Sequence, residues 1–128
     1  MKIIIAGSRS IDELSYIEEA IAKSGFIITE VISGTAKGAD MFGEIWAKEN
    51  DIPIKDFPAK WNDINVSGAV VKRNSYGKYN ALAGHQRNAK MGDYADALIA
   101  VWDGKSKGTK HMIGYMKKIK KPVFIHKV

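Results

Sequence analysis

The sequence contains no cysteine among its 128 residues. Disulfide bonds and zinc–thiolate sites are therefore excluded, which is typical of a cytoplasmic protein. No apolar run approaches the roughly 18 residues that a membrane-spanning helix needs, so we expect no membrane partner. The apolar start at residues 1–6 is also too short for a secretory signal peptide. These absences predict a soluble, cytoplasmic protein.

Acidic residues are fewer than basic ones, with 14 Asp and Glu against 20 Lys and Arg, and the net charge is +6. A basic balance favours anionic partners, either nucleic acid or a phosphorylated small molecule. Part of the excess lies at residues 117–121, where lysines at a predicted helix end complement the helix dipole and need no partner. The length predicts one domain over residues 1–128, since a domain commonly has about 100 to 200 residues.

Apolar runs rich in β-branched residues alternate with segments of helical period, which is typical of βαβ units and a parallel sheet. We expect strands at 2–6, 30–33, 53–57, 97–102 and 123–126. Helices are expected between them, the first capped by Ser10 with Glu13 and closed by Gly25, the others at 39–50, 81–94 and 108–120. Right-handed crossovers then predict a single α/β, Rossmann-like, doubly wound domain of about five parallel strands in the order 3-2-1-4-5, with helices on both faces.

The periodicity fades between residues 59 and 80, where glycine and asparagine interrupt a basic and aromatic stretch. A long loop is expected there, and loops of this length in compact domains are usually functional. Trp61 lies in this loop, and two roles fit it equally: stacking on a base, or packing in the core.

A first glycine-bearing loop follows the first strand and opens the first helix. Glycine lets the backbone approach an anion closely, and the free N–H groups at a helix start point toward it. The loop supplies Gly7, a hydroxyl donor at Ser8 and, at Arg9, a forked cation suited to phosphate. An ordinary turn with a solvent-facing arginine has the same sequence, so this loop alone decides nothing.

A second loop repeats the arrangement after the second strand. Its candidate ligand-binding residues are Gly34, Thr35, Lys37, Gly38 and Asp40. The loop is neither a Walker A motif, since no Gly-Lys-Ser/Thr follows the glycines, nor a GxGxxG dinucleotide motif. Two roles fit Asp40: binding a ribose hydroxyl, or capping the helix.

A third set of candidates follows the fourth strand, and the helix before that strand adds Arg87 and Asn88. The candidates of the loop itself are Asp103, Gly104, Ser106, Gly108 and Thr109. In a doubly wound sheet, ligands bind at the carboxyl ends of the strands where the strand order reverses, and all three loops lie at such ends. Together they predict a site for a phosphate-bearing, nucleotide-type ligand. No histidine has a partner at metal-ligand spacing, so neither a metal nor a cofactor is expected.

Several segments resemble, in order, the small SLOG-superfamily proteins of bacteria and their phages. The matching segments are 5–9, 33–40, 57–61, 87–91 and 96–109. The resemblance covers nearly the whole chain, and its motifs are specific jointly rather than singly. It implies a Rossmann-like fold, a nucleotide-derived ligand and a homo-oligomer, either a dimer or a tetramer.

The same superfamily includes the LOG-type phosphoribohydrolases. Arg87 and the Gly108-Thr109 pair match the LOG pattern, but Met112 stands where those enzymes have a glutamate. A methionine can neither transfer a proton nor stabilise an oxocarbenium-like charge on ribose. The resemblance therefore favours binding without cleavage, and no catalytic residue is assigned.

Three functions stay open at this point. The first, which we expect, is a sensor or sequestering protein for an ADP-ribose derivative or a cyclic nucleotide, a role that the SLOG resemblance links to nucleotide signalling in anti-phage defence or counter-defence. The second is a nucleotide hydrolase that uses Asp40, Asp103 or Glu44 in place of the missing glutamate. The third is binding of single-stranded nucleic acid by residues 72–79, where basic and tyrosine residues alternate.

Overall fold

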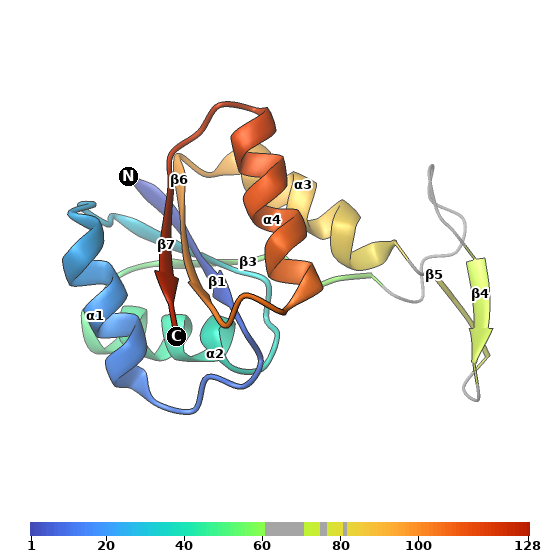
Figure 1. Cartoon of the computed structure of the whole chain (residues 1–128), viewed down its shortest axis with the longest axis horizontal. Helices are drawn as coiled ribbons and strands as arrows, with labels where there is room; N and C mark the ends of the chain where they lie inside the picture. The colour runs from blue at the N-terminus through green and yellow to red at the C-terminus, as the bar shows by residue number, and fades with distance from the viewer. Residues whose placement is uncertain (61–70, 75–76, 81) are drawn as a thin grey trace.

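The computed structural model describes residues 1–60, 71–74, 77–80 and 82–128 (Figure 1). Its main sheet has the strands β1 (Lys2–Gly7), β2 (Glu30–Ser33), β3 (Ile54–Asp56), β6 (Ala97–Trp102) and β7 (Val123–Lys127). All neighbouring pairs in this sheet are parallel, and the order is β3-β2-β1-β6-β7. The helices are α1 (Leu14–Ser24), α2 (Ala39–Glu49), α3 (Ala83–Tyr94) and α4 (Lys107–Lys118). None of these helices is long and apolar enough to cross a membrane.

The two faces of the sheet are covered by different helix pairs (Figure 1). Successive side chains of a strand point to opposite faces, so Ile3 and Ile5 of β1 pack with α1 and α2. Ile4 between them packs with α3 and α4, and all three isoleucines have no exposed surface. This burial on both faces explains why the central strands are continuous apolar runs and lack the alternation of polar and apolar residues found in half-exposed strands.

The predicted Rossmann-like sheet is confirmed, including the relative order of its five strands. The last two of these strands are labelled β6 and β7 because an additional antiparallel hairpin intervenes, formed by β4 (Val71–Asn74) and β5 (Gly77–Asn80). Part of the expected loop at 59–80 is therefore regular structure. The hairpin was missed because its strands are polar and lack the alternation of apolar residues that signals a strand. In Figure 1 it stands apart from the main sheet.

The predicted capping box at Ser10 was wrong. Helix α1 begins at Leu14, and its N-cap residue Glu13 makes no side-chain capping hydrogen bond. The N–H of Ile11 instead donates to the carbonyl of Ser8 at 3.4 Å, and the Ile11 side chain is buried in the core. Burial of Ile11 therefore delays the helix by nearly one turn. The predicted end at Gly25 is confirmed, where a φ of 70° closes the helix.

The end of β1 approaches β6 so closely that only glycine fits. A Cβ atom on Gly7 would lie 1.9 Å from the carbonyl oxygen of Val101, which belongs to the backbone of β6 and cannot move aside. The next residue, Ser8, donates its N–H to that same oxygen at 3.0 Å. Gly7 thus sets how the first loop leaves the sheet.

We expect Gly7→Ala to lower the free energy of unfolding by about 3 kcal/mol or to prevent folding, because overpacking against backbone cannot relax. Urea denaturation measures this loss. Gly114→Ala is the matched control, since a Cβ there meets nothing within 4 Å. Equal stability of the two variants would show that the close approach at Gly7 is not a constraint.

Candidate functional site

A cleft of about 250 Å³ lies at the carboxyl edge of the sheet, where the chain leaves β1 toward one face and β6 toward the other. Its wall is built from the end of β1 and the loop after it, the start of α2, the inner side of α3 and the first turns of α4. The residues that line it are Ala6, Gly7, Arg9, Ala36, Asp40, Arg87, Asn88, Met91, Ser106, Gly108, Thr109 and Met112. This is the point at which the strand order reverses, where doubly wound sheets bind ligands.

Half of the candidate residues chosen from the sequence line this cleft. They are Gly7, Arg9, Asp40, Arg87, Asn88, Ser106, Gly108 and Thr109. Sequence reasoning missed Ala6, Ala36 and Met91, and it considered Met112 only as a replacement for a glutamate. Ala6, Met91 and Met112 are nearly fully buried and belong to the core under α3 and α4. The cleft therefore has an apolar floor and a polar rim.

The remaining candidates lie outside the lining of the cleft. They are Ser8, Gly34, Thr35, Lys37, Gly38, Asp103 and Gly104, while Trp61 falls outside the described residues. Ser8 is 1% exposed, and its hydroxyl oxygen accepts the N–H of Asp103 at 2.9 Å. Its carbonyl also accepts the N–H of Ala39, at 3.2 Å. Ser8 thus holds three loops together, and this structural role accounts for its hydroxyl.

The glycines of the second loop make room for protein atoms. A Cβ atom on Gly38, where φ is 79°, would lie 2.4 Å from the carbonyl oxygen of Ser8. A Cβ atom on Gly34 would lie 2.6 Å from the Arg87 guanidinium and 2.8 Å from the Asp40 carboxylate. At Gly38 the backbone of the first loop fills the space that a side chain would need, and at Gly34 the ends of the Arg87 and Asp40 side chains fill it, so neither glycine by itself indicates a bound anion.

Asp103 orders the third loop. Its Oδ1 accepts the N–H groups of Lys105 at 2.7 Å and of Ser106 at 2.9 Å. These backbone hydrogen bonds hold the pKa of Asp103 below its ordinary value. The Asp103 carboxylate therefore faces its own loop, and its hydrogen bonds fix the position of Ser106, the N-cap residue of α4.

The first turn of α4 faces the cleft without a capping side chain or an acidic residue. Its early N–H groups have no partner inside the helix and carry the positive end of the helix dipole. The nearby exposed cations Lys107 and Lys110 add to that positive charge. Gly108 lines the cleft here, and a Cβ on it would meet no atom within 4 Å. Unlike Gly7, Gly34 and Gly38, it leaves open space beside the backbone.

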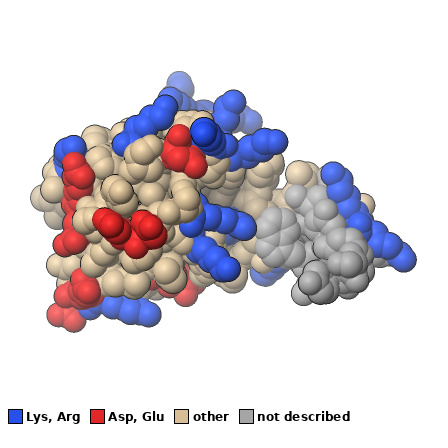
Figure 2. Space-filling model, turned by 60° about the horizontal axis from the view of Figure 1, so that its bottom comes forward, with Lys and Arg blue, Asp and Glu red and all other residues tan. Residues whose placement is uncertain are grey.

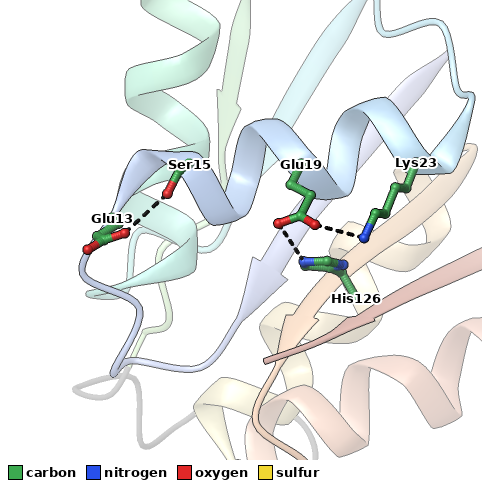
Figure 3. A network of polar contacts seen from close by, with 5 residues as sticks. All are labelled: Glu13, Ser15, Glu19, Lys23 and His126. Atoms are coloured by element: carbon green, nitrogen blue, oxygen red, sulfur yellow. Dashed lines mark hydrogen bonds and ion pairs between the residues drawn. The ribbon is translucent and has the colours of Figure 1, made fainter.

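Two arginines, Arg9 and Arg87, line the cleft. Arg87 donates from Nε to Asn88 Oδ1 at 3.0 Å and from Nη1 to the carbonyl of Gly34. The described part of the chain has two ion-pair contacts, and neither includes an arginine. Both are made by Glu19 of α1, one with Lys23 and one with His126 (Figure 3). Neither Arg9 nor Arg87 therefore has a carboxylate within ion-pair distance among these residues, although the charge of Arg87 acts to lower the pKa of Asp40.

Asp40 is a buried carboxyl group at the start of α2. Burial raises its pKa from the ordinary 3.8 to about 6, against the opposing effects of the N–H of Ala36 and the charge of Arg87. The Ala36 N–H donates to Asp40 Oδ2 at 3.2 Å. Near neutral pH the group is mostly ionised, at a cost in stability, and it takes up a proton as the pH falls through about 6.

Replacement of this carboxyl group tests its ionisation. Because the folded-state pKa is raised, ionisation destabilises the fold as the pH rises from 3.8 through about 6. We expect Asp40→Asn, which keeps an acceptor for Ala36, to raise the free energy of unfolding at neutral pH by about 1 to 3 kcal/mol. The gain should vanish in acid, below the ordinary pKa of the group. Urea denaturation across pH measures it, with the exposed Asp12→Asn as a control; a gain that is independent of pH would contradict the account.

Comparisons with known proteins agree with this fold. Residues 1–63 match the model of the YAcAr family, described as the YspA, cpYpsA-related SLOG family. No curated protein matches the sequence. The X-ray structure of DNA processing protein A (DprA) from Streptococcus pneumoniae is similar, with a TM-score of 0.70 and 16% identity over 97% of this chain.

This likeness to DprA shows the fold alone, and the chain spans about half the length of that protein, 49%. The family match ends at residue 63, so it includes the first two glycine loops but neither Arg87 nor the third loop. The resemblance inferred from the sequence is nevertheless confirmed, because residues 1–63 match the model of the YspA, cpYpsA-related SLOG family.

Proposed function

We propose that the cleft binds a nucleotide-derived small molecule, with a phosphate of that ligand on the first turn of α4. The observation that carries the proposal is the charge of this turn. It lines the cleft with no side-chain cap and no acidic residue. Lys107 and Lys110 are cations at the positive end of a helix dipole, an unfavourable arrangement that an anion would relieve.

The other parts of the ligand follow from the remaining lining. The apolar floor of Ala6, Met91 and Met112 suits the face of a base, since methionine adapts its shape and contacts aromatic rings favourably. Asp40 on the rim suits a ribose hydroxyl. The volume of about 250 Å³ is below the range of about 300 to 1,000 Å³ usual for drug-sized ligands, so the described cleft fits one nucleotide unit of a larger signal.

We propose that the protein holds this ligand intact, as a sensor or a sequestering protein for an ADP-ribose derivative or a cyclic nucleotide. Met112, at the floor of the cleft, offers no proton and no negative charge to a ribose. Assembly into a dimer or tetramer, and a role in anti-phage defence or counter-defence, belong to the same proposal.

Native mass spectrometry of protein purified from cells tests the proposal. The expected spectrum shows a bound mass of nucleotide size, and denaturation releases the intact molecule for identification. The same spectrum gives the oligomeric state. A ligand-free protein that converts nucleoside monophosphates to free base and ribose phosphate would contradict it.

The open space beside Gly108 gives a sharper test. Gly108→Ala should leave the helix at least as stable, with a gain below about 1 kcal/mol because Gly108 lies in the first turn. The new methyl group should nonetheless weaken binding of AMP about tenfold by crowding the phosphate. Gly114→Ala, in the same helix and equally unobstructed, should stabilise without affecting binding. Calorimetry measures the affinity of each variant for AMP. Equal affinities of the two variants would contradict a phosphate on this turn.

A nucleotide hydrolase is the second candidate, and Asp40 is the observation in its favour. Of the three carboxylates considered from the sequence, only Asp40 lines the cleft, while Glu44 and Asp103 do not. A buried carboxyl with a pKa of about 6 is suited to transfer a proton near neutral pH. Asp40→Asn separates the two functions: it should abolish turnover in a hydrolase, but in a binding protein it should retain or strengthen the binding of an anion.

Binding of nucleic acid finds one supporting observation in the hairpin. The register of β4 and β5 places Arg73 opposite Lys78, so two basic positions are neighbours on this hairpin. Figure 2, however, shows Lys and Arg on several separate parts of the face in view, with no continuous basic groove. A steep loss of oligonucleotide affinity with added salt would favour this function.

A further inference from the structure

We propose that His111 is a positioning residue of the cleft: its unprotonated Nδ1 holds Asn88, and through Asn88 it holds Arg87 and the first turn of α4. Acidification should therefore loosen the cleft and release an anionic ligand. The positioning role concerns contacts within the protein, whereas its effect on ligand release rests on the function proposed above.

The contacts of Asn88 fix the orientation of its side-chain amide. Arg87 Nε can only donate, so the Asn88 atom that it reaches at 3.0 Å must be the oxygen. The carbonyl of Gly108 can only accept, so the Asn88 atom that lies 3.2 Å from it must be the nitrogen. Exchanging the two amide atoms would break both hydrogen bonds.

This orientation determines the state of His111. The same Asn88 nitrogen lies 3.1 Å from His111 Nδ1, and its second hydrogen is available for that contact. Nδ1 must therefore accept, which requires a ring that carries no proton on this nitrogen. An imidazolium has N–H donors on both nitrogens, so protonation would set two donors against each other.

The histidine has a second contact, which also opposes protonation. Its ring stacks on that of His85 from α3, with ring centroids 3.9 Å apart and an angle of 6° between the planes. Burial, and after it the charge of His85, hold the pKa of His111 below its ordinary value. Lys107 and Lys110 on its own helix are further cations. Asp93 is a carboxylate on the α3 side of the α3–α4 interface, and it accepts a hydrogen bond from the Tyr115 hydroxyl at 2.6 Å.

The contacts form a continuous connection across the cleft. His111 and Gly108 belong to α4, Asn88 and Arg87 belong to α3, and Arg87 reaches the carbonyl of Gly34 after β2. Asn88 is 4% exposed, so water cannot readily replace a contact that it loses. Protonation of His111 would thus release Asn88, and Arg87 would lose the acceptor of its Nε.

The predicted direction of the pH effect is opposite to that of simple charge attraction. An added positive charge on His111 would strengthen binding of an anion, and protonation of Asp40 would do the same by removing a negative charge. Loss of the Asn88 contacts should outweigh both, because Arg87 and Gly108 are in the lining itself. The sign of the pH dependence therefore separates positioning from attraction.

Nuclear magnetic resonance of the ligand-free protein tests the positioning role directly. The side-chain amide of Asn88 and the Nε–H of Arg87 should shift together on acidification, with one midpoint below the ordinary histidine pKa of about 6.5. In His111→Asn, whose side-chain oxygen can replace Nδ1 as acceptor, that transition should disappear. His85→Asn should move the midpoint to higher pH. The proposal would be overturned if the signals of Asn88 and Arg87 did not shift while His111 titrates.

Binding of ADP-ribose tests the consequence, since its pyrophosphate diester does not titrate in this range. The wild type should lose about fivefold to tenfold in affinity between neutral and mildly acidic pH, the effect of one or two hydrogen bonds. His111→Asn should keep its affinity, and His111→Lys should bind weakly at both pH values. His126→Asn, at the remote Glu19 contact, should behave as the wild type.

The NMR titration and the binding measurement distinguish the positioning role of His111 from the proposed ligand class. If ADP-ribose does not bind at either pH but the coupled signals titrate, the positioning role stands and the proposed ligand class fails. If ADP-ribose binds more tightly on acidification in the wild type, attraction outweighs positioning, and the release of ligand by acid is contradicted.

Discussion

The structure depends on the close approach of three chain segments at the carboxyl edge of the sheet. Ser8 is the residue where they meet: its N–H donates to Val101 on β6, its carbonyl accepts the N–H of Ala39 on α2, and its hydroxyl accepts the N–H of Asp103. Gly7 permits this approach because a side chain there would enter the backbone of β6. The position of the cleft relative to α2, α3 and α4 follows from these contacts.

This constraint changes the meaning of the glycine-rich loops. A glycine beside a predicted phosphate site is usually read as room for the ligand, yet Gly34 and Gly38 give their room to Arg87 and to Ser8. Gly108 is the lining glycine with open space, and it lies on a helix turn without acidic residues. We therefore place the proposed anion site on α4, whereas the loops after β1 and β2 contribute to the wall of the cleft and contact Arg87.

Much of the fold could be predicted from the sequence because burial on both faces imposes a simple pattern. Segments such as 97–102 are apolar at every position, and the right-handed crossover then limits the strand order. The carboxyl-end rule also brought Arg9 and Asp40 together, and Arg87, chosen on the helix before the fourth strand, lines the same cleft. What it could not give is the direction of each side chain: Ser8 turns inward while its neighbour Arg9 faces the cleft. That difference depends on Val101 and Asp103, more than 90 residues along the chain. Met91 on the floor of the cleft could not be recognised from the sequence as a site residue, because an apolar position on a helix fits an ordinary core equally well.

A crystal structure of the protein with AMP tests the central claim most directly. The account predicts that the phosphate oxygens accept hydrogen bonds from the backbone N–H groups at the start of α4, around Gly108 and Thr109, with Arg9 or Arg87 beside them. A phosphate bound on the loop at 34–38, or a nucleotide bound outside the cleft, would contradict it.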